Sequence, residues 1–139
     1  MDIKKLVGAW QLWRTICDGK TGKISAMWGK GTFSPSSKGE LTYFEEVSHW
    51  TAAKTLHRAT KMYGYRLTKS AFEIYSRDTA EERLFLTLSI HRERLEGQAT
   101  CGCDCYRLQW RWQNANAFWQ RYCIVGPRKN CVITSIFSR

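Results

Sequence analysis

Residues 106–112, with the sequence Tyr-Arg-Leu-Gln-Trp-Arg-Trp, alternate between large apolar side chains and long polar ones. Successive side chains of an extended chain point to opposite faces, so the apolar members share one face and the polar members the other. This period of two predicts a β-strand that has one face in a core and the other in solvent.

The same alternation continues on both sides of this strand. Toward the C-terminus, residues 113–116 and 126–130 are rich in Asn, Gly and Pro and predict turns. Toward the N-terminus, the segments Asp18–Gly22 and Ser34–Gly39 predict further turns. The other predicted strands are 6–16, 24–33, 41–47, 56–67, 72–75, 84–91, 118–125 and 131–139. A short helix within 48–55, and a helix over 79–95 in place of a strand, are open alternatives.

About nine short strands with short connections, and no alternation with helices, predict an all-β protein. A sheet of so many antiparallel strands must curl or close to protect its edges. We therefore expect a single closed antiparallel up-and-down β-barrel of about 8–10 strands, with a β-sandwich as the second possibility. Residues 1–139 contain no linker and no internal repeat, which predicts one domain.

The composition is that of a globular protein with a basic surface. Hydrophobic residues make up 43% of the 139 residues and charged residues 24%, as in soluble domains. Seven Trp, six Tyr and six Phe residues suit pleated strands better than helices. The net charge of +10 would suit a polyanionic partner, although the Lys and Arg residues are scattered along the chain.

The N-terminal residues 1–19 are interrupted by Trp10, Trp13 and Arg14, where a secretory signal would need an apolar run. No window of the sequence is long and apolar enough for a membrane-spanning helix. We therefore expect a cytoplasmic protein without membrane contacts, whose six cysteines are reduced thiols.

Two groups of residues are similar to those of known families. Gly8-Ala9-Trp10, together with Arg139 at the end of the chain, resembles the lipocalin-like pattern in which an Arg from the last strand packs over a Trp on the barrel floor. Nearly the whole chain resembles the uncharacterised family DUF6314, which is thought to adopt a lipocalin-like (calycin) barrel. The matching residues are Leu6, Gly8, Trp10, Arg14, Gly31, Phe33, Leu41, Tyr43, Glu45, Ala59, Lys61, Tyr63, Tyr65, Cys101, Asp104, Tyr106, Gly126, Pro127, Arg128, Lys129, Ile133, Phe137 and Arg139.

This resemblance implies the fold, since the family has no assigned activity to carry over. The chain also departs from the family at two positions. Lys61 stands where the family usually has Arg, and Ala99 stands where it commonly has His. A function that needed this His for a metal or for proton transfer would be lost here.

The predicted inward faces carry many more polar groups than a simple core needs. Those residues are Arg14, Tyr43, Glu45, Lys61, Tyr63, Tyr65, Asp104 and Tyr106. They allow two interpretations. The charges pair internally and the tyrosines complete a hydrogen-bond network, or the groups surround a cavity that binds a small polar or anionic molecule. In the second case, we expect Arg14 and Lys61 to bind a carboxylate or phosphate.

Two other classes of function remain open. The outward Arg107, Arg111 and Arg121 beside Trp119 would suit a basic aromatic surface for single-stranded nucleic acid. A small isomerase or cyclase would instead use a carboxylate inside the barrel, Glu45 or Asp104, for proton transfer. The sequence does not decide between an enzyme and a binding protein, although it favours the latter.

No metal ion or cofactor is predicted. A zinc site would need closely spaced thiolates, and the spacing of Cys101, Cys103 and Cys105 does not provide them in an extended chain. Alternate residues of an extended chain lie about 6.6 Å apart, whereas thiolates around one zinc ion lie roughly 4 Å apart. The three histidines of the sequence are isolated from one another and give no sign of haem ligation.

Overall fold

The computed structural model describes residues 2–37, 39–77 and 81–139. One turn of 3₁₀ helix, η1 (Ile3–Leu6), precedes a chain made of strands. These are β1 (Gly8–Asp18), β2 (Ile24–Pro35), β3 (Glu40–Trp50), β4 (Leu56–Leu67), β5 (Ala71–Ser76), β6 (Arg83–His91), β7 (Arg94–Cys101), β8 (Asp104–Asn114), β9 (Ala117–Val125) and β10 (Asn130–Ser138).

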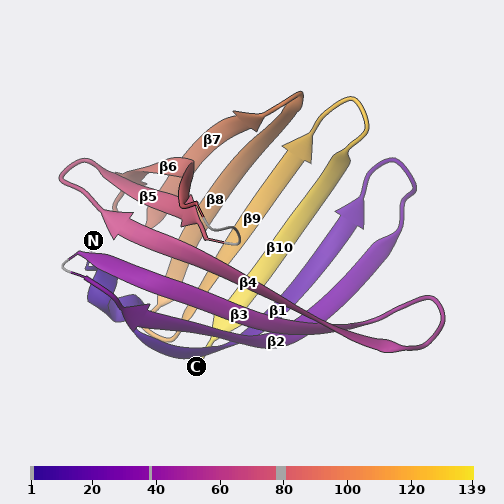
Figure 1. The fold of residues 1–139 in the computed structure, drawn as a ribbon, viewed down its shortest axis with the longest axis horizontal. Coiled ribbons are helices and arrows are strands. Elements are labelled where there is room, and N and C mark those ends of the chain that lie inside the picture. The colour runs from indigo at the N-terminus through magenta and orange to yellow at the C-terminus, as the bar shows by residue number, and fades with distance from the viewer. Residues whose placement is uncertain (1, 38, 78–80) are drawn as a thin grey trace.

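The ten strands form a closed barrel in which each strand pairs with its neighbours in sequence, and β10 returns to pair with β1 (Figure 1). Every pair is antiparallel. The prediction of an all-β, closed up-and-down barrel is confirmed. Neither helix considered as an alternative forms, since β3 extends to Trp50 and β6 occupies most of the second segment.

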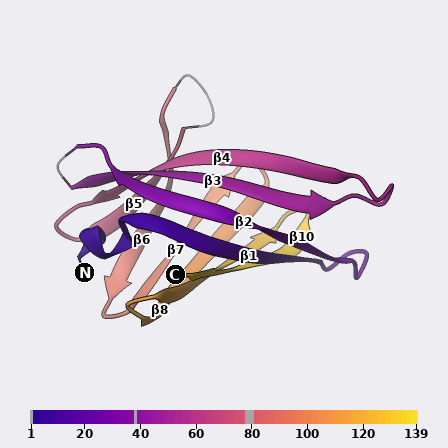
Figure 2. The same cartoon turned by 90° about the horizontal axis from the view of Figure 1, so that it is seen from below.

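The barrel is closed at the end where β1 begins and β10 ends. There η1 and the last residues of β10 lie toward the same end of the barrel (Figure 2). The indole nitrogen of Trp10 donates to the carbonyl of Leu6 at 2.8 Å, and the Arg139 guanidinium lies 4.0 Å from the centre of the Trp10 ring. Arg139 also donates to the carbonyls of Val7 and Lys5. The first and last residues of the barrel therefore seal the same end.

Aromatic rings fill this closed half. Phe118 stacks on Phe137 at a centroid distance of 4.4 Å and on Trp110 at 5.0 Å. Trp10 meets Phe118 edge to face at 4.8 Å. Because all four rings are almost completely buried, this half is a packed core with no room for a ligand.

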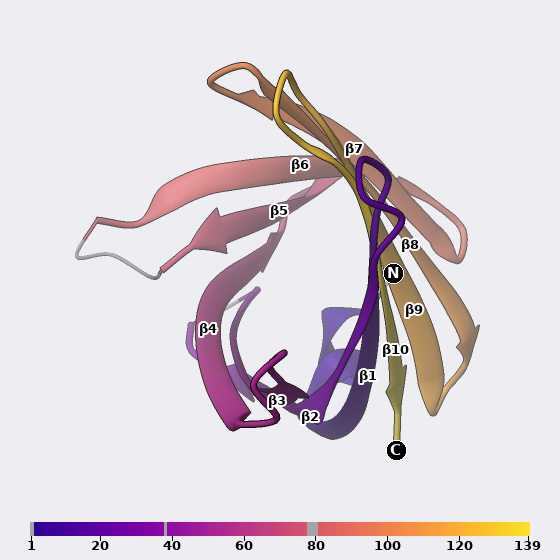
Figure 3. The ribbon, with the colours of Figure 1, turned by 90° about the vertical axis from the view of Figure 1, so that its right-hand side faces the viewer.

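The other half of the barrel is interrupted at β5 and β6. Strand β4 pairs with β5 only from Tyr63 to Leu67, and β6 pairs with β7 only over three residue pairs beginning at Ser89. The β5–β6 hairpin leans away from the barrel (Figure 3). The first half of β4 therefore lacks a hydrogen-bonded neighbour on the side of β5.

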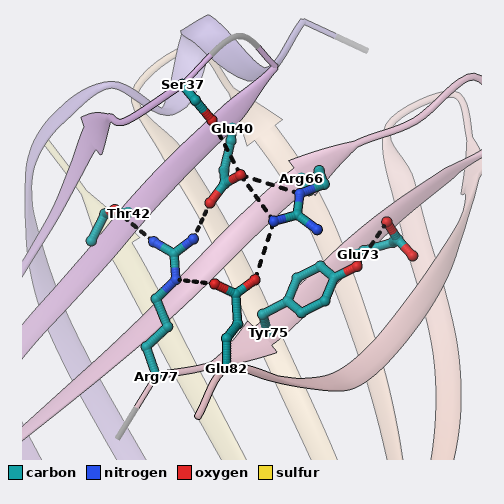
Figure 4. Close-up of polar contacts among 8 residues, drawn as sticks. All are labelled: Ser37, Glu40, Thr42, Arg66, Glu73, Tyr75, Arg77 and Glu82. Atoms are coloured by element: carbon teal, nitrogen blue, oxygen red, sulfur yellow. Dashed lines mark hydrogen bonds and ion pairs between the residues drawn. The ribbon is translucent and has the colours of Figure 1, made fainter. Parts of the chain in front are cut away.

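A network of charged side chains links the two residues that flank the β5–β6 connection to the outer surface of β3 and β4 (Figure 4). Arg77, just after β5, pairs with Glu40 and donates to Thr42 at 2.9 Å. Glu82, just before β6, accepts from Arg77 and from Arg66 at 3.2 and 3.1 Å. A side chain at position 64 would collide with the Arg77 guanidinium, since an added Cβ would come within 2.7 Å. Gly64 therefore lets Arg77 lie across β4.

Candidate functional site

A cavity of about 290 Å³ occupies the half of the barrel away from Trp10. Its walls come from β1, β2, β3, β4, β6, β8, β9 and β10, so it lies inside the barrel and not in a surface groove. Its volume is at the lower end of the range of about 300–1,000 Å³ for small-molecule pockets. The space suits one small molecule.

An ion pair lies in the wall of the cavity. Two nitrogens of the Arg14 guanidinium donate to the two carboxylate oxygens of Glu45 at 2.7 and 2.9 Å, and its third nitrogen donates to Ser135 at 2.8 Å. The Tyr43 hydroxyl donates to Glu45 at 3.0 Å. The exposed fractions of the Arg14 and Glu45 side chains are only 16% and 5%, so the pair is largely desolvated.

The charges of this pair cancel, and the surroundings of Arg14 keep its guanidinium charged. Burial lowers the pKa of Arg14, but the Glu45 carboxylate outweighs this effect and raises the pKa above its ordinary value. Internal pairing, which the sequence offered as one interpretation, therefore holds for Arg14 and Glu45. Three of the five N–H groups of a guanidinium are used in these bonds, which leaves two.

Five of the six tyrosines of the chain line the cavity. They are Tyr43, Tyr63, Tyr65, Tyr106 and Tyr122. Burial raises the pKa of Tyr43, Tyr65 and Tyr122 above the ordinary value. These phenols are therefore protonated at neutral pH and act as hydrogen-bond donors. The sixth tyrosine, Tyr75, lies outside the barrel against Arg66.

Phe85 enters the cavity because of a β-bulge. In the pairing of β5 with β6, Ile74 faces Leu86 and Tyr75 faces Leu84, so Phe85 is an extra residue between them. The Phe85 ring lies among Tyr63, Tyr106 and Tyr122. Leu84 is 52% exposed. Simple alternation predicts that Leu84 faces inward and Phe85 outward; the bulge reverses the orientation of both residues.

The cavity opens beside residues 56–62 of β4, which pair with β3 but lie outside the described pairing with β5. The consecutive residues Ala59, Thr60 and Lys61 all line it and are all exposed. Consecutive residues of a strand can line one space only where the strand edge itself borders that space. Lys61 therefore stands at the opening and not in the interior. With Arg14 and Glu45 neutralising each other, the charged lining residues sum to +1.

The structure departs from the predicted lining set at Asp104, which is not among the residues that line the cavity. It begins β8 at the rim of the barrel, next to the turn that joins β9 and β10, and its carboxylate lies 3.5 Å from the Lys129 ammonium. Tyr106 and Asp104 together raise the pKa of Lys129. The other seven predicted residues all line the cavity, and neither Glu45 nor Asp104 is an unpaired carboxylate.

Several lining residues were missed by the sequence reasoning. Besides Phe85, they include Gln120, Tyr122, Ile124 and Ser135. The alternation of residues 118–125 put the first three on one face, and that face could have been assigned to the interior by analogy with β8. Ser135 carried no such signal, since its importance comes from its contact with Arg14 in a distant part of the sequence.

Other candidate sites are less developed. Among the described residues, no group of three or more His, Cys, Asp or Glu side chains is placed to hold a metal ion. The six cysteines form no disulfide. In the part of the chain that the structure describes, no helix has the length and apolar character needed to cross a membrane.

A closed up-and-down barrel with a ligand-sized interior defines a calycin-like protein. The chain belongs to the family of unknown function DUF6314, whose model matches residues 6–139. None of the curated protein sequences compared with the chain matches it.

Solved structures share the fold at low sequence identity. An S-type phycobiliprotein lyase from Guillardia theta has a TM-score of 0.66 at 6% identity, and the match covers 97% of this chain and 87% of the lyase. The redesigned β-barrel mFAP1, bound to DFHBI, has a TM-score of 0.51 at 14% identity, with 98% and 96% covered. EF1p2_mFAP2b, also bound to DFHBI, has a TM-score of 0.53 at 12% identity, with 98% and 94% covered.

Proposed function

We propose that this protein binds a small polar or anionic molecule in the cavity of its barrel. The observation that carries the proposal is a space inside the barrel lined by several hydrogen-bond donors, among them the Arg14 guanidinium and the phenols of five tyrosines. The Glu45 carboxylate is already used by Arg14 and Tyr43. Two N–H groups of the Arg14 guanidinium remain for a ligand, and the Tyr122 phenol lines the same cavity.

A ligand that offers oxygen acceptors would satisfy these donors. The guanidinium donors of Arg14 and the phenol donors of the lining tyrosines favour a ligand whose oxygens carry a negative or partial negative charge. Similarity of fold supports the proposal only in a general way: two of the structurally similar barrels hold a small molecule, DFHBI.

Native mass spectrometry of the protein purified from cells tests this proposal. Ala59→Trp should block the opening at an exposed position, where a larger side chain costs little stability. Thr134→Trp, on the outer face of β10, is the matched control. We expect wild type and Thr134→Trp to carry a bound small molecule that Ala59→Trp lacks. Indistinguishable spectra for wild type and Ala59→Trp would contradict the proposal.

A second candidate function rests on the outer face of the barrel. The cross-strand pairing of five strands places Trp28, Trp13, Ile136, Trp119 and Arg111 in one continuous row. Trp13 is 50% exposed and Ile136 46% exposed. A row of indoles that are exposed or partly exposed can stack on the bases of a single strand, since every base offers a flat face.

The charges of this face favour the same partner. The outward positions of β8, β9, β10, β1 and β2, all of them described residues, carry Arg107, Arg111, Arg121 and Lys30 but no Asp or Glu. Arg111 and Arg121 lie 5.7 and 5.3 Å from the centre of the Trp119 ring. Guanidinium groups so placed can bind phosphates beside a stacked base.

Binding of a fluorescent oligothymidylate at several salt concentrations tests the second function. We expect Trp119→Ala to weaken binding by roughly tenfold, and affinity to fall steeply with salt. Phe44→Ala, at an exposed position of β3, should have no effect. Equal effects of the two variants on binding would overturn this candidate. So would a protein that does not bind the oligonucleotide but forms a dimer that Trp119→Ala abolishes.

A further inference from the structure

Four aromatic rings of the cavity form a series in which each ring is nearly parallel to the next, whereas Tyr65 is tilted to Tyr43 and Tyr63. The angle between the ring planes is 14° for Tyr43 and Tyr63, 13° for Tyr63 and Phe85, and 15° for Phe85 and Tyr122. The centroids of these pairs are 6.3–6.4 Å apart. The four rings come from the separate strands β3, β4, β6 and β9, so neighbouring positions on one strand do not explain their alignment.

These nearly parallel rings give the cavity flat walls in one orientation. Tyr106 completes the shape, because its ring stands at 76° to Phe85 with the centroids 5.5 Å apart. A flat molecule that lies parallel to the four rings can make offset-stacked contacts with them and meet Tyr106 with its edge. A flexible aliphatic chain would make poorer contact with the same walls.

The polar groups lie at two places around these rings. At one place, Arg14 is held by Glu45 and Ser135, and it retains two N–H groups. At the other, Lys61 stands at the opening with its ammonium 5.6 Å from the centre of the Tyr63 ring. Both places offer donors and positive charge, and both suit an oxygen that accepts hydrogen bonds.

We infer that the ligand is a planar aromatic or conjugated molecule that carries an acidic or carbonyl oxygen. This inference rests on the proposed function and narrows its ligand class. The ring lies parallel to Tyr43, Tyr63, Phe85 and Tyr122. The oxygen accepts hydrogen bonds from the donors at one of the two polar places. The β-bulge at Phe85 contributes to this selection, because it turns a phenyl ring into the cavity from a position that would otherwise face solvent.

Two probes with the same head group test the ligand class. 2-Naphthoate is flat, whereas decanoate is flexible and of similar size, and both are carboxylates. The ratio of their dissociation constants, measured by calorimetry or by tyrosine fluorescence, reports the preference for a flat ligand. We expect wild type to bind 2-naphthoate at least tenfold more tightly than decanoate.

Two matched variants separate shape selection from general burial. Phe85→Leu keeps an apolar side chain in the cavity but removes the flat ring, so the ratio should fall by roughly two- to tenfold. Phe44→Leu makes the same replacement on the outer surface, where Phe44 is 40% exposed, and should leave the ratio unchanged. Circular dichroism identifies any variant that fails to fold, and Phe85→Tyr, which keeps the ring, should then retain the preference.

The outcomes distinguish this inference from the proposed function. Equal binding of the two probes, or binding of neither, overturns the planar class. An unchanged ratio in Phe85→Leu overturns the role of the ring. The proposed function itself stands or falls separately, on the bound mass that wild type carries and Ala59→Trp lacks. A co-purified aliphatic ligand would support small-molecule binding in the cavity but overturn the inference that the ligand is planar.

Discussion

Arg14 and Glu45 form a two-fold hydrogen-bonded ion pair although their strands, β1 and β3, are not neighbours. Strand β2 lies between them, where the partner of Arg14 is Met27 and the partner of Glu45 is Gly31. The inward position between those two partners is Gly29. The absence of side chains at Gly29 and Gly31 leaves room for the Arg14 side chain to reach across the barrel interior.

Removing one member of this ion pair should lower the free energy of unfolding much more than removing both. Glu45→Met and Arg14→Met each leave an uncompensated buried group, and each should lower the free energy of unfolding by about 3–5 kcal/mol. The double variant Arg14→Met/Glu45→Met should be closer to wild type than either single variant. Guanidinium unfolding measures all three. Additive losses would show that the two side chains are not coupled.

Truncation of Trp10 should destabilise the barrel through its closed end. Trp10 is only 1% exposed and contacts Phe118, Trp112 and Arg139. Trp10→Ala should therefore lower the free energy of unfolding by about 3–5 kcal/mol. Trp13→Ala removes an indole that is 50% exposed, and we expect a loss below about 1 kcal/mol. Similar losses for both variants would argue against the assigned barrel floor.

The stability of the fold should fall in acid because the Glu40 carboxylate becomes protonated. Burial raises the pKa of Glu40, but the hydrogen bonds and charges of Arg66 and Arg77 outweigh it and hold the pKa below its ordinary value. A carboxyl whose pKa is lower in the folded state contributes stability above its unfolded pKa. It loses that contribution as the pH falls through the folded value. Thermal melts should therefore show a decline below about pH 4.3.

Glu40→Gln provides the control for this decline. It cannot titrate, so the acid-dependent part of the melting temperature assigned to Glu40 should disappear, while the variant is already less stable at neutral pH. An acid decline as steep in Glu40→Gln as in wild type would assign the effect to other carboxyls.

A methyl group at position 31 should disturb the cavity wall. A Cβ added to Gly31 would come within 2.7 Å of the Tyr43 ring and hydroxyl, and Tyr43 donates to Glu45. We expect Gly31→Ala to cost about 1–3 kcal/mol of unfolding free energy, as other overpacked cores do. Gly102→Ala, in the β7–β8 turn, meets no atom within 4 Å and shows the cost of backbone strain alone, because its φ is +63°. A crystal structure of Gly31→Ala with Tyr43 unmoved would contradict this account.

The alternating pattern of single strands was sufficient to predict the barrel and most of its polar lining. Tyr43, Glu45, Tyr63 and Tyr65 face the interior because their strands alternate regularly and pair in register. The partner of each residue was less predictable. That Arg14 meets Glu45 and Ser135 depends on the closure of β1 onto β10 and on the glycines of β2, which no local pattern reveals.

Two local irregularities account for the residues that were misplaced. The extra residue in β6 turns Phe85 inward, and a bulge moves side chains to the opposite face without changing the hydrophobic pattern. Asp104 has the alternation of an inward residue, but it lies at the first position of its strand, where the barrel wall ends. Strand ends are set by turns and pairing partners, which the alternation alone does not locate.

A ligand that binds as proposed enters the space lined by five tyrosines. NMR spectra of protein labelled with ¹³C at the tyrosine ζ carbon test this directly, with Tyr→Phe variants used for assignment. On addition of 2-naphthoate, we predict shifts of Tyr43, Tyr63, Tyr65, Tyr106 and Tyr122, while Tyr75 on the outer surface stays unchanged. Shifts confined to Tyr75, or equal shifts of all six signals, would contradict binding inside the barrel.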